Sequence, residues 1–153
     1  MKVYLASSFS LIPFVVQVAE YLEESGHTIA VKWWAKDGFG VYSEETHRQT
    51  CTDVPADLFY DKPHVRAIYQ RDSAGVRACD ALVIVAGGVP RKFNGANVEY
   101  GLALGHGKPC YSIGALENSA LYYPVTRCKT LLELVDRLEA FIPYRAEDRK
   151  EGD

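Results

Sequence analysis

The chain has 153 residues, of which 48% are hydrophobic, so it is long enough and apolar enough to form one domain with a substantial core. Its formal net charge is -3 and it contains no basic run, which argues against a nucleic-acid polymer or an anionic membrane as partner. A small neutral or modestly charged ligand is compatible with these values.

Cysteine and histidine positions indicate neither a disulfide framework nor a metal site. No C-x-x-C spacing occurs, so we expect reduced structural thiols, and the histidines lack the spacing of metal ligands. We therefore expect no metal and no cofactor. The chain shows no signal-peptide core and no apolar run long enough to span a bilayer, which predicts a cytoplasmic protein.

The first part of the chain predicts a strand, a helix and a second strand. An apolar run over residues 3–6 leads into the polar turn 7–10. Hydrophobic residues then recur at helical spacing over residues 14–22, with Ser10 as the expected N-cap. A second strand is predicted over about residues 28–34.

The middle of the chain begins with a polar segment, residues 41–62, which we expect to be a long loop that serves as a lid or interface segment. Pro63 can begin the next helix, with Tyr69 and Val76 on its partly buried face. This helix leads to a continuous apolar run over residues 81–86, which predicts a buried strand.

The stretch 94–109 predicts a polar, glycine-rich turn followed by a helix that ends at Gly107. Glu99 is expected in or near the first turn of this helix, where the dipole and free N–H groups favour a carboxylate. Small residues at 101, 103 and 105 are expected to let the helix lie close on the sheet. An alternative is that Glu99 only complements the dipole.

The last part of the chain predicts a fourth strand over residues 110–113 and a short fifth strand near residues 125–126. Thr130 is expected to cap a final amphipathic helix. The apolar side of that helix is predicted to contain Leu131, Leu132, Leu134, Val135, Leu138 and Phe141. We expect residues 1–144 to form a single domain and the charged residues 145–153 a flexible tail.

Strands that alternate with helices predict an α/β fold, a three-layer sandwich around a parallel five-stranded sheet, with flavodoxin-like order 2-1-3-4-5. In that order a ligand crevice opens between strands one and three, at their carboxyl ends. The loops expected there are residues 7–10, 33–40 and 87–97. Neither a G-x-G-x-x-G fingerprint after the first strand nor a P-loop motif occurs.

Three parts of the sequence resemble one known family. They are Tyr4-Leu5-Ala6, Asp72 upstream of the third strand, and the pattern G-x-x-x-E-x-G-x-A-x-x-x-G-K-P from Gly95 to Pro109. Together they resemble the nucleoside 2-deoxyribosyltransferase family, which includes deoxynucleoside 5'-monophosphate N-glycosidases. The resemblance runs from the first strand to the fourth. It implies cleavage of the N-glycosidic bond of a nucleoside or nucleotide, with the sugar passed to another base or to water.

The resemblance also implies roles for three residues. Glu99 matches the nucleophile, which would form a covalent glycosyl ester, and the helix N-terminus is expected to keep it ionised. Asp72 matches a residue that assists proton transfer or binds a hydroxyl; alternatively it is an exposed helical residue paired with Arg71. Tyr4 matches a residue that orients the nucleophile, although ordinary strand packing accounts for it equally well.

Substrate-binding residues are implied around the crevice. Trp33, Trp34 and Phe39 match the region that sandwiches the base, although one of the two tryptophans is expected to be buried because strand neighbours face opposite ways. Asn118 matches the region through which a neighbouring subunit completes the site, which predicts a homodimer with a shared active site. The other expected substrate-binding residues are Ser7, Ser8, Phe9, Gly87, Gly88, Asn94, Gly95 and Asn97.

One position departs from the family pattern. Phe93 stands where transferases tend to carry Asp and monophosphate hydrolases Ser, so the sequence does not decide between these substrate classes. Arg91 and Lys92 are candidate phosphate ligands or a solvated loop tip. Two other functions stay open: a nucleotide-binding or sensing module without turnover, and an NAD-type glycohydrolase.

Overall fold

The computed structural model describes residues 1–35, 63–87, 94–116 and 120–141, and within them the side chains of residues 63–65 and 94 are not described. Five parallel strands form one sheet of order β2-β1-β3-β4-β5, which confirms the predicted order. The strands are β1 (Lys2–Ser7), β2 (Thr28–Ile29), β3 (Ala81–Val85), β4 (Cys110–Ile113) and β5 (Thr126–Cys128). The helices are η1 (Phe9–Leu11), α1 (Ile12–Glu24), α4 (Pro63–Ala78), α5 (Asn94–Gly105), η2 (Ala120–Tyr122) and α6 (Leu131–Ala140).

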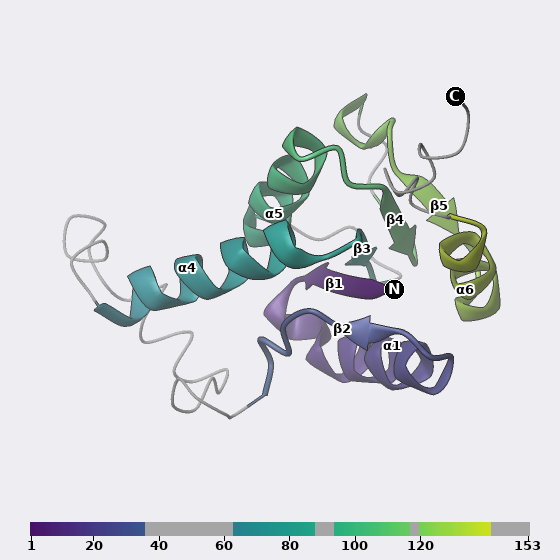
Figure 1. Ribbon diagram of the computed structural model, residues 1–153, viewed down its shortest axis with the longest axis horizontal. Helices are drawn as coiled ribbons and strands as arrows, with labels where there is room; N and C mark the ends of the chain where they lie inside the picture. The colour runs from purple at the N-terminus through teal and green to yellow at the C-terminus, as the bar shows by residue number, and fades with distance from the viewer. Residues whose placement is uncertain (36–62, 88–93, 117–119, 142–153) are drawn as a thin grey trace, which may run out of the picture.

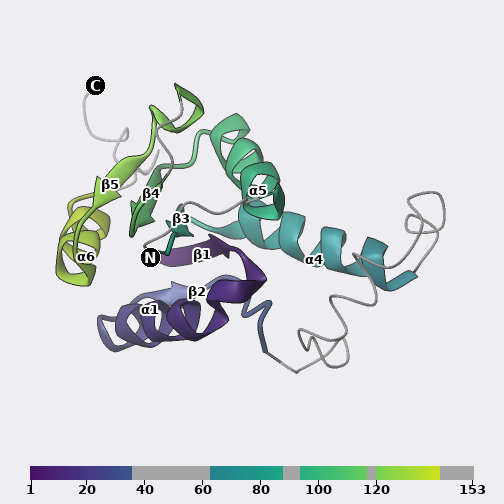
Figure 2. The ribbon, with the colours of Figure 1, turned by 180° about the vertical axis from the view of Figure 1, so that it is seen from behind.

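Helices cover both faces of the sheet. Figure 1 shows α1 and α6 on one side and α4 with α5 on the other, and the view from behind in Figure 2 shows the same separation. The described chain is therefore a three-layer α/β sandwich, as the alternation of strands and helices predicts.

The two central strands explain why the core lies where it does. Residues 3–6 of β1 and the whole of β3 are buried, because helices cover them from both sides. Strands buried on both faces read as continuous apolar runs, as residues 81–85 do. The register pairs Val3 with Ala81 and Ser7 with Val85, so β1 and β3 end together at the carboxyl edge of the sheet.

The second strand is much shorter than the sequence predicts. It ends at Ile29, and Trp33 and Trp34 lie in a turn in which the Ala35 amide donates to the Lys32 carbonyl, 2.9 Å away. Among the described strands, β2 lies at the edge of the sheet and pairs with β1 alone, over the register Lys2 with Thr28 and Val3 with Ile29. Few ladder bonds hold it, so the chain leaves the sheet early.

The helix ends agree with the sequence at some positions and differ at others. Thr130 caps α6 as predicted, because its hydroxyl accepts from the Glu133 amide at 3.1 Å. Ser10 is not an N-cap, since it lies inside η1 and α1 begins only at Ile12. The apolar side of α6 is narrower than predicted: Leu134, Val135 and Leu138 are buried, whereas Leu132 and Phe141 are exposed. Tyr69 of α4 is also exposed rather than partly buried.

Candidate active site

Glu99 stands deeper in its helix than the sequence predicts. α5 begins at Asn94, so Glu99 lies in its second turn. The helix packs on the sheet through Ala96, Tyr100 and Ala103, which are buried. The glycines at 101 and 105 are exposed instead, with open space where a side chain would lie, because a helix turns them about 100° per residue away from that face.

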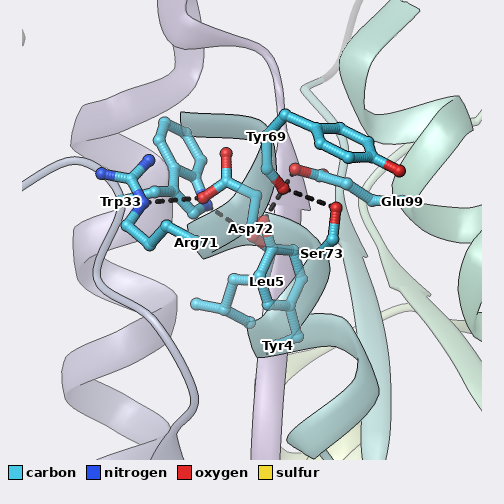
Figure 3. A network of polar contacts seen from close by, with 8 residues as sticks. All are labelled: Tyr4, Leu5, Trp33, Tyr69, Arg71, Asp72, Ser73 and Glu99. Carbon is cyan, nitrogen blue, oxygen red and sulfur yellow. Dashed lines mark hydrogen bonds and ion pairs between the residues drawn. The ribbon is translucent and has the colours of Figure 1, made fainter. Parts of the chain in front are cut away.

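Tyr4 holds the carboxyl group of Glu99. The Tyr4 side chain is fully buried in the middle of β1, and its hydroxyl donates to Oε1 of Glu99 at 2.7 Å (Figure 3). The ring therefore packs in the core, as the packing interpretation predicts, and the hydroxyl makes the contact with the Glu99 carboxyl group that an orienting role would require. The bond joins β1 to α5, and α4 packs against both of these elements.

Asp72 lies on α4, the helix that packs against both β1 and α5. Its Oδ1 accepts from Nε of Arg71 at 2.8 Å, and each of these two side chains is 18% exposed. Asp72 is thus paired with Arg71, as the alternative interpretation proposed, but it is largely buried rather than exposed. Its charge acts on both Tyr4 and Glu99, which places the four residues in one carboxyl cluster: Tyr4, Arg71, Asp72 and Glu99.

A glycine allows α4 to approach the cluster. A Cβ on Gly75 would lie 2.5 Å from Cγ2 of Val31 and 3.1 Å from two ring carbons of Tyr4. Gly75 comes three residues after Asp72, on the same side of the helix. The missing side chain therefore lets α4 rest on Tyr4 and brings Asp72 to the cluster. The sequence analysis did not single out Gly75, although a glycine that is kept inside a helix despite its cost in helix stability can have a packing reason.

Burial decides the charge state of Glu99. Loss of solvation raises the pKa of its carboxyl group to about 8, and the charge of Asp72 adds to this effect. The Tyr4 hydrogen bond and the Arg71 charge lower it, without compensating. The expectation that the helix N-terminus keeps Glu99 ionised is therefore wrong, since the dipole effect falls off within the first turn. At neutral pH the protonated form of Glu99 therefore predominates.

The neighbours of Glu99 also have shifted pKa values. Burial raises the pKa of Tyr4, and the nearby charges of Glu99 and Asp72 raise it further, so the phenol stays protonated and can donate. Burial raises the pKa of Asp72 above its ordinary value, whereas the hydrogen bond and charge of Arg71 lower it. Perturbed carboxyl groups that share a site are typical of acid–base and nucleophilic chemistry.

Aromatic residues line the neighbouring part of β1. Trp33 is buried, and its Nε1 donates to the Leu5 carbonyl at 2.7 Å. Phe9 and Trp34 both approach Trp33 edge to face, with ring centroids 5.4 Å away. One of the two tryptophans is thus buried, as expected. The two side chains point in different directions because they lie in a turn, and not because they are neighbours on a strand.

Small polar residues expected to bind substrate are engaged at the carboxyl edge of the sheet. The Ser7 hydroxyl donates to the Val85 carbonyl at 2.7 Å, which ties β1 to β3, and the hydroxyl oxygens of Ser8 and Ser10 are 3.1 Å apart. A Cβ on Gly87 would lie 2.9 Å from Cδ2 of Leu11, so the glycine permits close packing on η1.

Asn97 turns to a different neighbour. Its side-chain oxygen accepts from the Tyr122 hydroxyl, and the Tyr100 hydroxyl donates to the Leu121 carbonyl at 2.7 Å. These two bonds fix η2 against α5. Gly95 is exposed on α5. The remaining predicted positions lie outside the described residues: Phe39, Gly88, Arg91, Lys92, Phe93, Asn118, the side chain of Asn94, the 41–62 loop and residues 145–153.

Two further observations concern the described residues alone. No three His, Cys, Asp or Glu side chains among them are grouped as a metal ion would require. None of their helices combines the length and the apolar character that crossing a membrane demands.

Comparisons with known proteins place the fold. No protein-family model and no curated protein matches the sequence. A solved 2-deoxyribosyltransferase of Bacillus psychrosaccharolyticus matches with TM-score 0.59 and 17% identity, covering 89% of this chain and 91% of that one. The CMP N-glycosidase of Clostridium botulinum matches with TM-score 0.50 and 16% identity, covering 92% of this chain and 100% of that one. The chain has the fold of the nucleoside 2-deoxyribosyltransferase family.

Proposed function

We propose that this chain cleaves the N-glycosidic bond of a nucleoside or nucleotide through a covalent glycosyl ester on Glu99, and passes the sugar to another base or to water. The observation that carries the proposal is the 2.7 Å hydrogen bond from buried Tyr4 to Glu99, with the Asp72–Arg71 pair beside it. The shared fold with a 2-deoxyribosyltransferase and a CMP N-glycosidase supports it.

In the first step a Glu99 oxygen attacks the anomeric carbon of the sugar. Because Tyr4 donates to Oε1, we assign the attack to Oε2. The bond between the anomeric carbon and the base nitrogen breaks, and its electron pair leaves with the base, which takes up one proton from a water molecule that the Asp72 carboxylate orients. A carboxylate is suited to this step because it stabilises the positive charge that develops on the sugar.

In the second step water or a nitrogen of another base attacks the same carbon. The ester bond to Glu99 breaks, the carboxylate takes back the electron pair, and the attacking group releases one proton. Tyr4 keeps the carboxyl group in one orientation through both steps, because its ring is fixed in the core. Such positioning converts substrate binding into rate by holding the reacting atoms in line.

The raised pKa sets a condition on this mechanism. Glu99 attacks as the carboxylate, so kcat/KM should rise with pH until about 8, the pKa of its carboxyl group in the free protein. The same raised pKa suits a general acid, in which case Asp72 would carry the sugar. Mass spectrometry of acid-quenched enzyme locates the glycosyl group on one residue or the other.

The decisive experiment is chromatography after incubation with deoxynucleosides, ribonucleosides and their 5'-monophosphates, each with and without an acceptor base. Glu99→Gln should abolish product, whereas Glu20→Gln, an exposed change on α1, should leave it intact. Free base without acceptor identifies a hydrolase, and a new nucleoside only with acceptor identifies a transferase. Full activity in Glu99→Gln would refute the covalent mechanism. No product from any substrate would favour binding without turnover, and nicotinamide released from NAD would favour a glycohydrolase.

A further inference from the structure

The Arg71–Asp72 pair has a local geometry that helices do not supply by default. Successive residues on an α-helix point about 100° apart and do not face one another. Nevertheless Nε of Arg71 lies 2.8 Å from Oδ1 of Asp72, and both side chains are largely buried. The Arg71 side chain is therefore turned toward its neighbour Asp72, and in the view of Figure 3 the Asp72 carboxyl group lies between the guanidinium and Glu99.

The ionisable groups around Glu99 come from two elements. β1 contributes Tyr4, and α4 contributes Arg71 and Asp72. β3, which also packs against α5, has the sequence ALVIV and contains no ionisable side chain. The ionisable residues of β4 contact other groups: the Cys110 thiol donates to the Lys108 carbonyl, and the Tyr111 hydroxyl donates to the Arg137 carbonyl. Among the described residues, Arg71 is the cation that acts on Glu99.

We propose that Arg71 is a positioning residue of the cleavage reaction: it orients the Asp72 carboxyl group and supplies positive charge that favours the ionised form of Glu99 beside a negative Asp72. This inference rests on the proposed function for its catalytic consequence. In this proposal α4 provides both the acidic group, Asp72, and the cation that balances its charge, Arg71.

The physical basis is the cost of two negative charges in one poorly solvated site. Two carboxylates that share a site repel, so that one of them resists ionisation until a cation compensates. Arg71 lowers the pKa of both Asp72 and Glu99, which is the direction required. A guanidinium also fixes the orientation of the carboxyl group that it binds, because its donors lie in one plane. The ammonium of Lys is instead a point charge on a flexible stem.

The test compares Arg71→Gln and Arg71→Lys with the wild type and with Arg77→Gln, an exposed change on the last turn of the same helix. Carboxyl ¹³C-labelled glutamate gives the Glu99 titration by NMR, with Glu99→Gln assigning the signal. The pH profile of kcat/KM is measured on the substrate that the panel shows to be cleaved. Arg71→Gln should raise the Glu99 pKa by about one unit and lower kcat/KM at pH 7 by about tenfold, with recovery at high pH.

The other variants separate charge from geometry. Arg71→Lys should keep most of the Glu99 titration but lower kcat, and Arg77→Gln should match the wild type. A uniform loss in Arg71→Gln at every pH, with an unchanged Glu99 titration, would overturn the inference. If Arg71→Gln fails to fold, wild-type kcat and titration in Arg71→Lys overturn it equally. An inactive wild type would refute the proposed function alone, because the NMR titration still decides what Arg71 does.

Discussion

Replacing Glu99 by Gln should stabilise the protein, and increasingly so as the pH rises. The pKa of this carboxyl group is raised from 4.5 to about 8 on folding, chiefly by burial. Between these values the folded chain binds more protons than the unfolded chain, so the contribution of Glu99 to stability falls as the pH rises through this window. Gln has nearly the same shape and cannot ionise, so the variant does not undergo this loss.

The magnitude follows from the two pKa values. One unit corresponds to about 1.4 kcal/mol, so the shift from 4.5 to about 8 amounts to about 5 kcal/mol once both states are ionised. At about pH 5 the cost of ionisation is still below about 1 kcal/mol, because the carboxyl group is protonated in the folded chain. The free energy of unfolding of Glu99→Gln relative to wild type should therefore increase by about 4 kcal/mol between about pH 5 and about pH 9.

Urea denaturation followed by circular dichroism measures this difference at each pH. Glu20→Gln serves as the control, because Glu20 is exposed on α1 and its replacement removes the same charge without uncovering a buried site. Its difference from wild type should stay flat across the range. A flat difference for Glu99→Gln as well would refute the argument that burial keeps Glu99 protonated.

Four other changes probe the site and the fold. Tyr4→Phe removes the donor to Glu99 and should move the acid limb of kcat/KM upward by about one to two pH units, since a hydrogen bond to a charged group contributes about 1.5–3 kcal/mol. Gly114→Ala should cost roughly 3 kcal/mol or more in urea, because its φ is +91 and a Cβ would lie 1.8 Å from the Ala86 carbonyl oxygen. Gly101→Ala, in open space on α5, should instead stabilise by about 1 kcal/mol; a loss there would contradict the helix geometry. Thr130→Ala should lower the free energy of unfolding by about 1 kcal/mol. An unchanged value would show that the hydrogen bond from the Glu133 amide to the Thr130 hydroxyl does not stabilise the fold.

Features that depend on local pattern could be predicted from the sequence. The apolar run of β3, the cap at Thr130 and the turn at Gly107 that follows α5 each depend on residues within one turn or one strand. The sheet order followed because parallel strands joined by helices allow few arrangements. The family motif drew attention to Tyr4, Asp72 and Glu99, which the structure brings together.

Features that depend on tertiary contacts could not be predicted. The raised pKa of Glu99 arises because α4 and β1 bury it, and the sequence near Glu99 does not reveal that covering. Asn97 looked available for substrate, but its partner Tyr122 is 25 residues away. The turn at Trp33 follows from the short pairing of β2, since strand propensity alone does not report how many ladder bonds an edge strand finds.

The hydrogen bond between Tyr4 and Glu99 spans 95 residues of chain, and this has a kinetic consequence. No short fragment can hold these two groups together, because β1 must first pair with β3 across the intervening crossover. During refolding the cluster should therefore form late and in a single step. Trp33, which bonds to the β1 carbonyl next to Tyr4, offers a fluorescence signal for that step. Partly folded chains should then be inactive rather than weakly active. The fraction of activity that is lost should therefore equal the fraction of molecules that are not fully folded.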